Sequence, residues 1–122
     1  MFKEVQGKEE KMLSVNNKSD YIPAMIEYIK ENYNKKINLD TLCKMYGYST
    51  RNFRRLFAEK TGKSPNDFLI ELRIQKAIEL LKTNRHTVVS AAKEVGYDDS
   101  NYFNRLFCKK TGFSPGNIKS TR

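Results

Sequence analysis

The sequence predicts an all-α fold in which two similar helical modules are joined by one long helix. Two stretches of thirteen residues, 53–65 and 103–115, are identical at nine positions, so the chain contains an internal repeat. Between the copies, the apolar residues of segment 65–83 recur at helical spacing. No stretch alternates apolar and polar residues as a strand would. Two copies are too few for a solenoid, so we interpret them as a pseudo-symmetric pair of modules.

Composition limits the class of protein. The chain has 122 residues, 39% of them apolar, which suffices for one domain or two very small ones sharing a core. No apolar run exceeds three residues, which excludes a membrane span and a signal-peptide core. The net charge of +9 favours a polyanionic partner, nucleic acid first and an acidic membrane surface second. Membrane binding is disfavoured because no helix joins a lysine-rich face to an exposed apolar one.

Residues for metal or enzymatic chemistry are scarce. The two cysteines, Cys43 and Cys108, form no CxxC pair and His86 is the single histidine, so we predict no metal site and no cofactor. Without a second histidine, nucleophilic catalysis is disfavoured, and we predict that the protein is not an enzyme. Asp98 and Asp99 are adjacent acids, a pattern more typical of helix caps than of catalysis. We expect His86 to be a solvated loop residue and the cysteine-poor, leaderless chain to be cytoplasmic.

Each copy of the repeat predicts two short helices around a glycine turn. A capping residue begins each helix and a glycine with positive φ follows its end. The residues predicted for these roles are Asn38, Gly47, Ser49 and Gly62 in the first copy and Thr87, Gly96, Asp98 and Gly112 in the second. In both copies a Ser-Pro pair, an N-cap with proline at the first helical position, then starts another helix. Helix, short glycine turn, helix is the helix-turn-helix pattern.

These elements divide the chain into four segments. Residues 1–18 are polar and lack periodicity, so we interpret them as a flexible tail or the remnant of a linker. The first helix-turn-helix module is predicted over 19–63 and opens with an amphipathic helix over 20–33. A linker helix follows at 64–84, and the second module occupies 85–122.

The linker helix is apolar around most of its circumference, so a module on each side is needed to cover it. Its polar residues form one narrow stripe of Glu71, Gln75, Glu79 and Lys82. Arg73 lies inside the apolar arc, where a structural ion pair or carbonyl contact is favoured over the alternative of phosphate binding. The helix spans ~28 Å at about 1.5 Å per residue, and successive major-groove segments on one DNA face lie ~34 Å apart. One monomer could therefore read two half-sites.

The second helix of each copy has an outward face suited to the major groove. In the first copy the core face is Phe53, Leu56 and Phe57, which leaves Arg51, Arg54, Arg55 and Ala58 outward. In the second copy the core face is Phe103, Leu106 and Phe107, which leaves Ser100, Asn101, Asn104, Arg105 and Cys108 outward. Arg suits guanine and phosphate, Asn suits adenine, and small side chains admit a thymine methyl. An ordinary solvated face is the alternative, but it more often carries a mixture of Lys and Glu.

Charge is unequal between the two helices. The first is counted with five basic residues and one acid, namely Arg51, Arg54, Arg55, Lys60 and Lys63 against Glu59. The second is counted with three basic residues and two acids, namely Arg105, Lys109 and Lys110 against Asp98 and Asp99. We expect the first to supply more electrostatic affinity and the second more discrimination between bases.

The sequence resembles the AraC/XylS family of bacterial transcription regulators over about residues 20–117. The matching motifs are Gly47-Tyr48-Ser49, Arg55-Leu56-Phe57, Thr61-Gly62 with Ser64-Pro65, Arg73-Ile74, Ala77, Leu80-Leu81, Gly96-Tyr97, Tyr102-Phe103, Arg105-Leu106-Phe107 and Thr111-Gly112 with Phe113-Ser114-Pro115. The resemblance implies a seven-helix domain with two helix-turn-helix modules that binds double-stranded promoter DNA. The family's base-contacting positions fall on Arg51, Arg54, Arg55, Ser100, Asn101, Asn104 and Arg105.

The sequence departs from the family pattern at two places. Cys43 stands where the family usually has a small alanine, which predicts a buried thiol without a redox role. Ile118-Lys119 stands where a Tyr-Arg pair is usual, which predicts a weak last helix.

The resemblance also bears on partners. Many family members carry a second domain that binds an effector or receives a phosphate, and 122 residues leave no room for one. We therefore interpret the chain as the DNA-binding part of a longer regulator rather than a natural stand-alone form. It is expected to bind DNA as a monomer, with RNA polymerase as a further candidate partner. The alternative is a basic helical module that docks acidic protein partners without DNA sequence specificity.

Overall fold

The computed structural model describes residues 21–120, with side chains to residue 118; the tail expected at 1–18 lies outside the described residues. Over this range the chain forms seven helices and no strand, which confirms the all-α prediction. The helices are α2 (Ile22–Asn32), α3 (Leu39–Met45), α4 (Thr50–Thr61), α5 (Pro65–Lys82), α6 (Val88–Glu94), α7 (Ser100–Thr111) and α8 (Pro115–Ser120). The predicted start of the first helix at Asp20 also lies outside the described residues.

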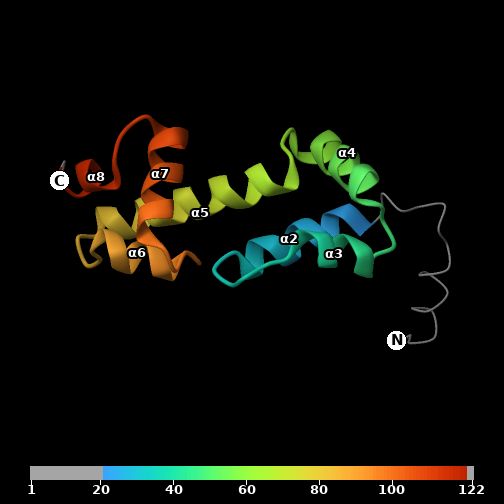
Figure 1. Ribbon diagram of the computed structural model, residues 1–122, viewed down its shortest axis with the longest axis horizontal. Helices are drawn as coiled ribbons and strands as arrows, with labels where there is room; N and C mark the ends of the chain where they lie inside the picture. The colour runs from blue at the N-terminus through green and yellow to red at the C-terminus, as the bar shows by residue number, and fades with distance from the viewer. Residues whose placement is uncertain (1–20, 121–122) are drawn as a thin grey trace.

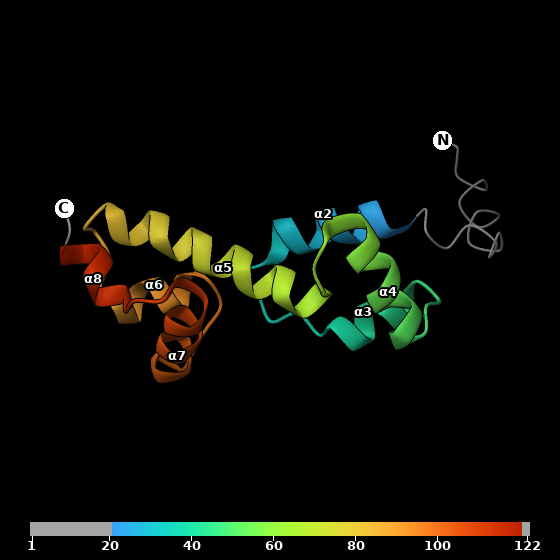
Figure 2. The same cartoon turned by 90° about the horizontal axis from the view of Figure 1, so that it is seen from above.

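The long helix α5 runs between two groups of helices (Figure 1). We call α2–α4 the first module and α6–α8 the second module. Figures 1 and 2 show the two modules at opposite ends of α5, with α4 and α7 toward the same side of it. The 18 residues of α5 make it ~27 Å long at about 1.5 Å per residue.

Local capping begins four of the helices as the sequence predicts. In each case the side-chain oxygen of the cap accepts a hydrogen bond from the backbone N–H three residues later, which satisfies a donor that the helix itself leaves unpaired. These caps are Asn38 for α3, Ser49 for α4, Ser64 for α5 and Thr87 for α6. The four glycines predicted to follow helix ends all have positive φ, between 80° and 106°.

The predicted cap of α7 is wrong. Asp99, not Asp98, caps this helix, and its Oδ1 accepts from the N–H groups of Asn101 at 3.0 Å and Tyr102 at 3.3 Å. The second copy of the repeat carries one extra residue between its Gly-Tyr pair and its first phenylalanine, so the cap shifts by one position. Asp98 instead forms an ion pair with Lys36, Nζ to Oδ2 3.1 Å.

Each module has its own hydrophobic core, and α5 contributes to both. Leu69 of α5 packs into the first core, with Ile22, Met25 and Ile29 of α2 and both phenylalanines of α4. Three residues of α5, Ile74, Ala77 and Leu81, pack into the second core with both phenylalanines of α7. Fully burying one phenylalanine contributes roughly 1.5–3 kcal/mol, so these rings are major sources of stability. The two cores confirm that α5 is covered by a module on either side.

The structure also bears on three smaller expectations, one of which is wrong. Cys43 is fully buried as predicted, and its Sγ donates to the Asp40 carbonyl at 3.3 Å. The last helix forms over six residues, with Ile118 packed against the second core. His86 is not a fully solvated loop residue: it is half-buried, and its Nδ1 lies 2.9 Å from Ser90 Oγ on α6.

Candidate nucleic-acid interface

The packing of α4 determines which of its side chains face outward. The rings of Phe53 and Phe57 are buried and in contact, with centroids 5.7 Å apart, and Phe57 also meets Phe68 of α5 at 5.3 Å. Thr61 Oγ1 donates to the Phe57 carbonyl at 2.9 Å, which closes the last turn. The opposite side of the helix is therefore left to solvent. The predicted site residues Arg51, Arg54 and Arg55 are all exposed there.

The same packing is repeated on α7. Phe103 and Phe107 are fully buried, with ring centroids 5.7 Å apart, and Thr111 Oγ1 donates to the Phe107 carbonyl at 2.8 Å. Because the buried positions are equivalent, the outward positions are equivalent too. The predicted residues Asn101, Asn104 and Arg105 are exposed, whereas Ser100 is only half-exposed, less outward than predicted.

Two of the outward arginines are held in place by neighbours on their own helix. Arg55 donates to Glu59 Oε2 at 3.1 Å and to Asn52 Oδ1 at 2.8 Å. The guanidinium of Arg105 lies over the Tyr102 ring, 5.8 Å from its centroid. Sequence reasoning missed Asn52 and Tyr102, although their spacing of three residues from each arginine is the spacing of helical neighbours.

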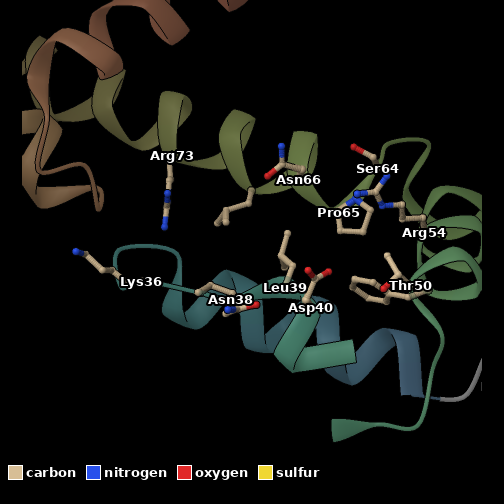
Figure 3. Close-up of a pocket in the computed structure, with 13 residues that line it drawn as sticks. Lys36, Asn38, Leu39, Asp40, Thr50, Arg54, Ser64, Pro65, Asn66 and Arg73 are labelled. Carbon is tan, nitrogen blue, oxygen red and sulfur yellow. The ribbon is translucent and has the colours of Figure 1, made fainter. Parts of the chain in front are cut away.

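Arg54 occupies the border of this surface. It lines a cavity of about 790 Å³ between α3, α4 and α5 (Figure 3). Figure 3 shows its guanidinium beside Ser64 and Pro65, at the start of α5. Arg54 is thus directed more toward the linker helix than along the outward face of α4.

Two basic residues counted with the recognition helices instead contact the linker helix. Lys63 Nζ lies 2.8 Å from Glu71 Oε1, and Lys110 Nζ lies 3.3 Å from Asp67 Oδ1 and 3.5 Å from Glu71 Oε2. The hydrogen bond from Lys63 lowers the pKa of the Glu71 carboxyl, and the hydrogen bond to Asp67 raises the pKa of Lys110. These pairs reduce the basic charge free to meet a polyanion.

The described part of the chain also bears on metal sites and membrane spans. Among residues 21–120 no group of His, Cys, Asp or Glu side chains is arranged to hold a metal ion. No helix described there is long and apolar enough to cross a membrane. What the described surface does present is two equivalent polar helix faces rich in Arg and Asn.

Comparison with known proteins identifies the family. A family model described as a helix-turn-helix domain matches residues 42–121. An uncharacterised HTH-type transcriptional regulator from Pseudoalteromonas carrageenovora is 34% identical over 116 residues, 95% of this chain and 69% of that protein. A probable AraC family transcriptional regulator from Rhodopseudomonas palustris superposes with a TM-score of 0.68, with 27% identity and coverage of 86% of this chain and 96% of that chain. This chain belongs to the AraC family. It is a DNA-binding domain of the kind found in transcription regulators, which is not a class of enzyme.

Other AraC-family relatives agree. The transcriptional activator RhaS from Escherichia coli is 28% identical over 109 residues, and this chain spans only 39% of its length. The C-terminal domain of AraT, a response regulator from Geobacillus stearothermophilus, superposes with a TM-score of 0.77, with 27% identity, 83% of this chain covered and 84% of that chain. The DNA-binding domain of AdpA, solved in complex with a target DNA, gives a TM-score of 0.76, with 25% identity and coverage of 82% and 90%.

Proposed function

We propose that this AraC-family domain binds promoter DNA as a monomer, with α4 and α7 in consecutive major-groove segments. The observation that carries the proposal is the repeated geometry of α4 and α7. Each buries two phenylalanines at equivalent positions and leaves an equivalent polar face outward, toward the same side of α5 (Figures 1 and 2). The ~27 Å length of α5 is of the same order as the ~34 Å that separates groove segments on one face of B-DNA.

The proposed contacts follow the chemistry of each face. On α4, Arg51 and Arg55 would meet guanine edges, and Arg54, at the border, would meet the phosphate backbone. On α7, Asn101 and Asn104 suit adenine, Arg105 suits guanine, and the half-exposed Ser100 would make a short polar contact. The first module would supply more electrostatic affinity and the second more base discrimination.

We also propose that the domain is part of a longer, bacterial cytoplasmic regulator under ligand or phosphorylation control. The chain spans 39% of RhaS, and its structural relative in AraT is the C-terminal domain of a response regulator. Within such a protein we place the modules at 19–63 and 85–122 and the linker helix at 64–84. RNA polymerase is a proposed further partner, which in vitro transcription from a bound promoter would test.

The central test compares specific with random DNA. Arg105→Ala is expected to weaken binding to a site selected from random sequences by about 5- to 150-fold, equivalent to roughly 1–3 kcal/mol. Binding to random duplex at the same salt concentration is expected to change much less. Lys82→Ala is the matched control. It removes one exposed positive charge from the last residue of α5, outside the two recognition helices. An equal loss of affinity for the selected site and for random duplex would show that Arg105 contacts only the phosphate backbone.

The alternative, a basic module that docks acidic proteins, predicts a different result. The unaltered domain would then show no preference for any selected site over random duplex at physiological salt. DNA-site specificity is favoured because equivalent outward positions of the two helices carry Arg on α4 and Asn or Arg on α7, side chains that suit base edges.

A further inference from the structure

We infer that Arg73 is a positioning residue that holds the two modules at one fixed separation. We call its contacts with both modules the Arg73 lock. A fixed separation would set the spacing between the two half-sites that the domain accepts. The DNA consequence rests on the proposed two-helix binding mode. The lock itself is a property of the free protein and is tested without DNA.

Arg73 is the one charged side chain that is buried among the described residues, with 8% of its surface exposed. It extends from the middle of α5 toward the segment that joins α2 to α3 (Figure 3). There its Nε donates to the Tyr33 carbonyl at 2.7 Å and its Nη2 donates to the Lys35 carbonyl at 2.8 Å. The first module is thus attached to α5 by two hydrogen bonds from a charged donor, which are stronger than neutral ones.

The same guanidinium also contacts the second module. The Cζ atom of Arg73 lies 4.8 Å from the centroid of the Tyr97 ring. Tyr97 belongs to the turn between α6 and α7. Tyr97 in turn packs on Phe103 of α7, with ring centroids 5.8 Å apart. One side chain therefore joins the first module's α2–α3 segment, the linker helix and the base of the second recognition helix.

Gly96 shows how closely these parts approach. A Cβ added at Gly96 would lie 3.2 Å from Arg73 Cζ and 3.2 Å from the Tyr33 carbonyl oxygen. At Gly47, the equivalent turn of the first copy, an added Cβ would meet no atom within 4 Å. The two copies of the repeat thus differ here, because only the second turn is pressed against Arg73.

Weaker contacts surround the lock. Lys36 pairs with Asp98 between the same two segments, and Lys76 Nζ lies 5.9 Å from the centroid of the Tyr33 ring. Both ends of the Lys36–Asp98 pair are exposed, and such pairs contribute little. Lysine cannot replace Arg73, because it lacks the planar fork that serves two carbonyls while stacking on a ring.

Arg73 belongs to neither hydrophobic core, although Tyr97 is a buried residue of the second core and Tyr33 packs against both. Most of the apolar packing within each module involves no contact with Arg73. An Arg73→Lys protein is therefore expected to keep its helices while its two modules move relative to one another. Because α4 and α7 belong to different modules, the distance between them becomes variable.

The chain offers a direct measurement of that distance. Cys108 is exposed on α7, Ala58 is exposed at the equivalent position of α4, and Cys43 is buried. Spin labels attached to Cys108 and to the cysteine of Ala58→Cys would report the distance between the two recognition helices by pulsed electron paramagnetic resonance. We expect one narrow distance distribution in the Arg73 protein and one at least twice as broad after Arg73→Lys. Equal widths in two proteins of equal helicity would overturn the lock.

A second pair of variants protects the test against simple misfolding. Gly96→Ala and Gly47→Ala both place a side chain at positive φ, at +106° and +81°, but only Gly96→Ala presses on Arg73. Gly96→Ala is expected to broaden the distance distribution and Gly47→Ala to leave it narrow. Broadening by both variants alike would assign the effect to backbone strain and overturn the inference.

The effect on DNA binding is tested with sites selected from random sequences. The Arg73 protein is expected to select paired half-sites with one spacing, and Arg73→Lys to accept spacings that differ by one or more base pairs with the same half-sites. One unchanged spacing would overturn the specificity claim. If the Arg73 protein selects no paired half-sites, the proposed function fails instead, while the spin-label distances still decide the lock.

Discussion

The carboxylate of Glu71 lies 2.8 Å from the ammonium of Lys63, so the linker helix is tied to the turn that follows the first recognition helix. Its other oxygen meets Lys110 of α7 at 3.5 Å. One acid on α5 therefore contacts basic residues of both modules. This arrangement makes the stability of the domain depend on the ionisation of Glu71.

The first prediction is a pH dependence. The hydrogen bond from Lys63 lowers the folded-state pKa of Glu71 below 4.5, so its stabilising effect is present above that value and is lost as the pH falls through the folded-state pKa. Both partners are partly exposed, so we expect Glu71→Gln to lower the free energy of unfolding at pH 7 by no more than about 1 kcal/mol. The difference between the two proteins, measured by urea unfolding, should shrink as the pH falls below 4.5. A difference that does not shrink as the solution is acidified would contradict the role given to Glu71.

The second prediction separates two adjacent acids. Asp99→Ala removes the cap of α7 and is expected to cost about 1 kcal/mol, within the roughly 0.5–2 kcal/mol typical of capping residues. Asp98→Ala removes only an exposed pair with Lys36 and is expected to cost less than about 0.5 kcal/mol. Thermal unfolding of both variants measures the difference. The reverse order of stability would show that Asp98 is the cap.

The third prediction concerns the two cores. Phe57 and Phe107 are fully buried at equivalent positions, so replacing either with alanine should cost about 3–5 kcal/mol. Because the two cores share only the partly buried Tyr33, hydrogen exchange should accelerate mainly in α2–α4 after Phe57→Ala and mainly in α6–α8 after Phe107→Ala. Acceleration spread evenly over both modules would mean that they unfold as one unit.

The fourth prediction concerns Arg55. Glu59 holds its guanidinium at 3.1 Å and places a negative charge beside the proposed DNA surface. Glu59→Gln should tighten binding to random duplex several-fold and lower the ratio of specific to random affinity, because Arg55 loses its fixed orientation. Glu79→Gln, the same charge change on α5, is the control for a general charge effect. An equal gain with both variants would remove any orienting role from Glu59.

Much of the fold could be predicted because the interactions that begin and end its helices are local. Capping residues act on N–H groups only three residues away, so the repeat, the glycines and the Ser-Pro pairs were sufficient. The cap of α7 was missed because one inserted residue shifts it from Asp98 to Asp99.

The contacts between modules were beyond the reach of sequence reasoning. Arg73 was expected to contact a carbonyl or an acid, but its acceptors, the carbonyls of Tyr33 and Lys35, lie 40 and 38 residues away. Lys110 was counted as a DNA-facing charge, yet it pairs with Asp67, 43 residues distant. Such contacts depend on the packing of α5 against both modules, which helical periodicity does not specify.

The central claim is that one copy of this domain reads two consecutive major-groove segments. Hydroxyl-radical footprinting on a selected site, combined with the protein-to-DNA ratio of the complex from sedimentation, tests it most directly. We expect two protected segments about ten base pairs apart on one face of the duplex, with one protein per site. A single protected segment, or two proteins per site, would contradict it.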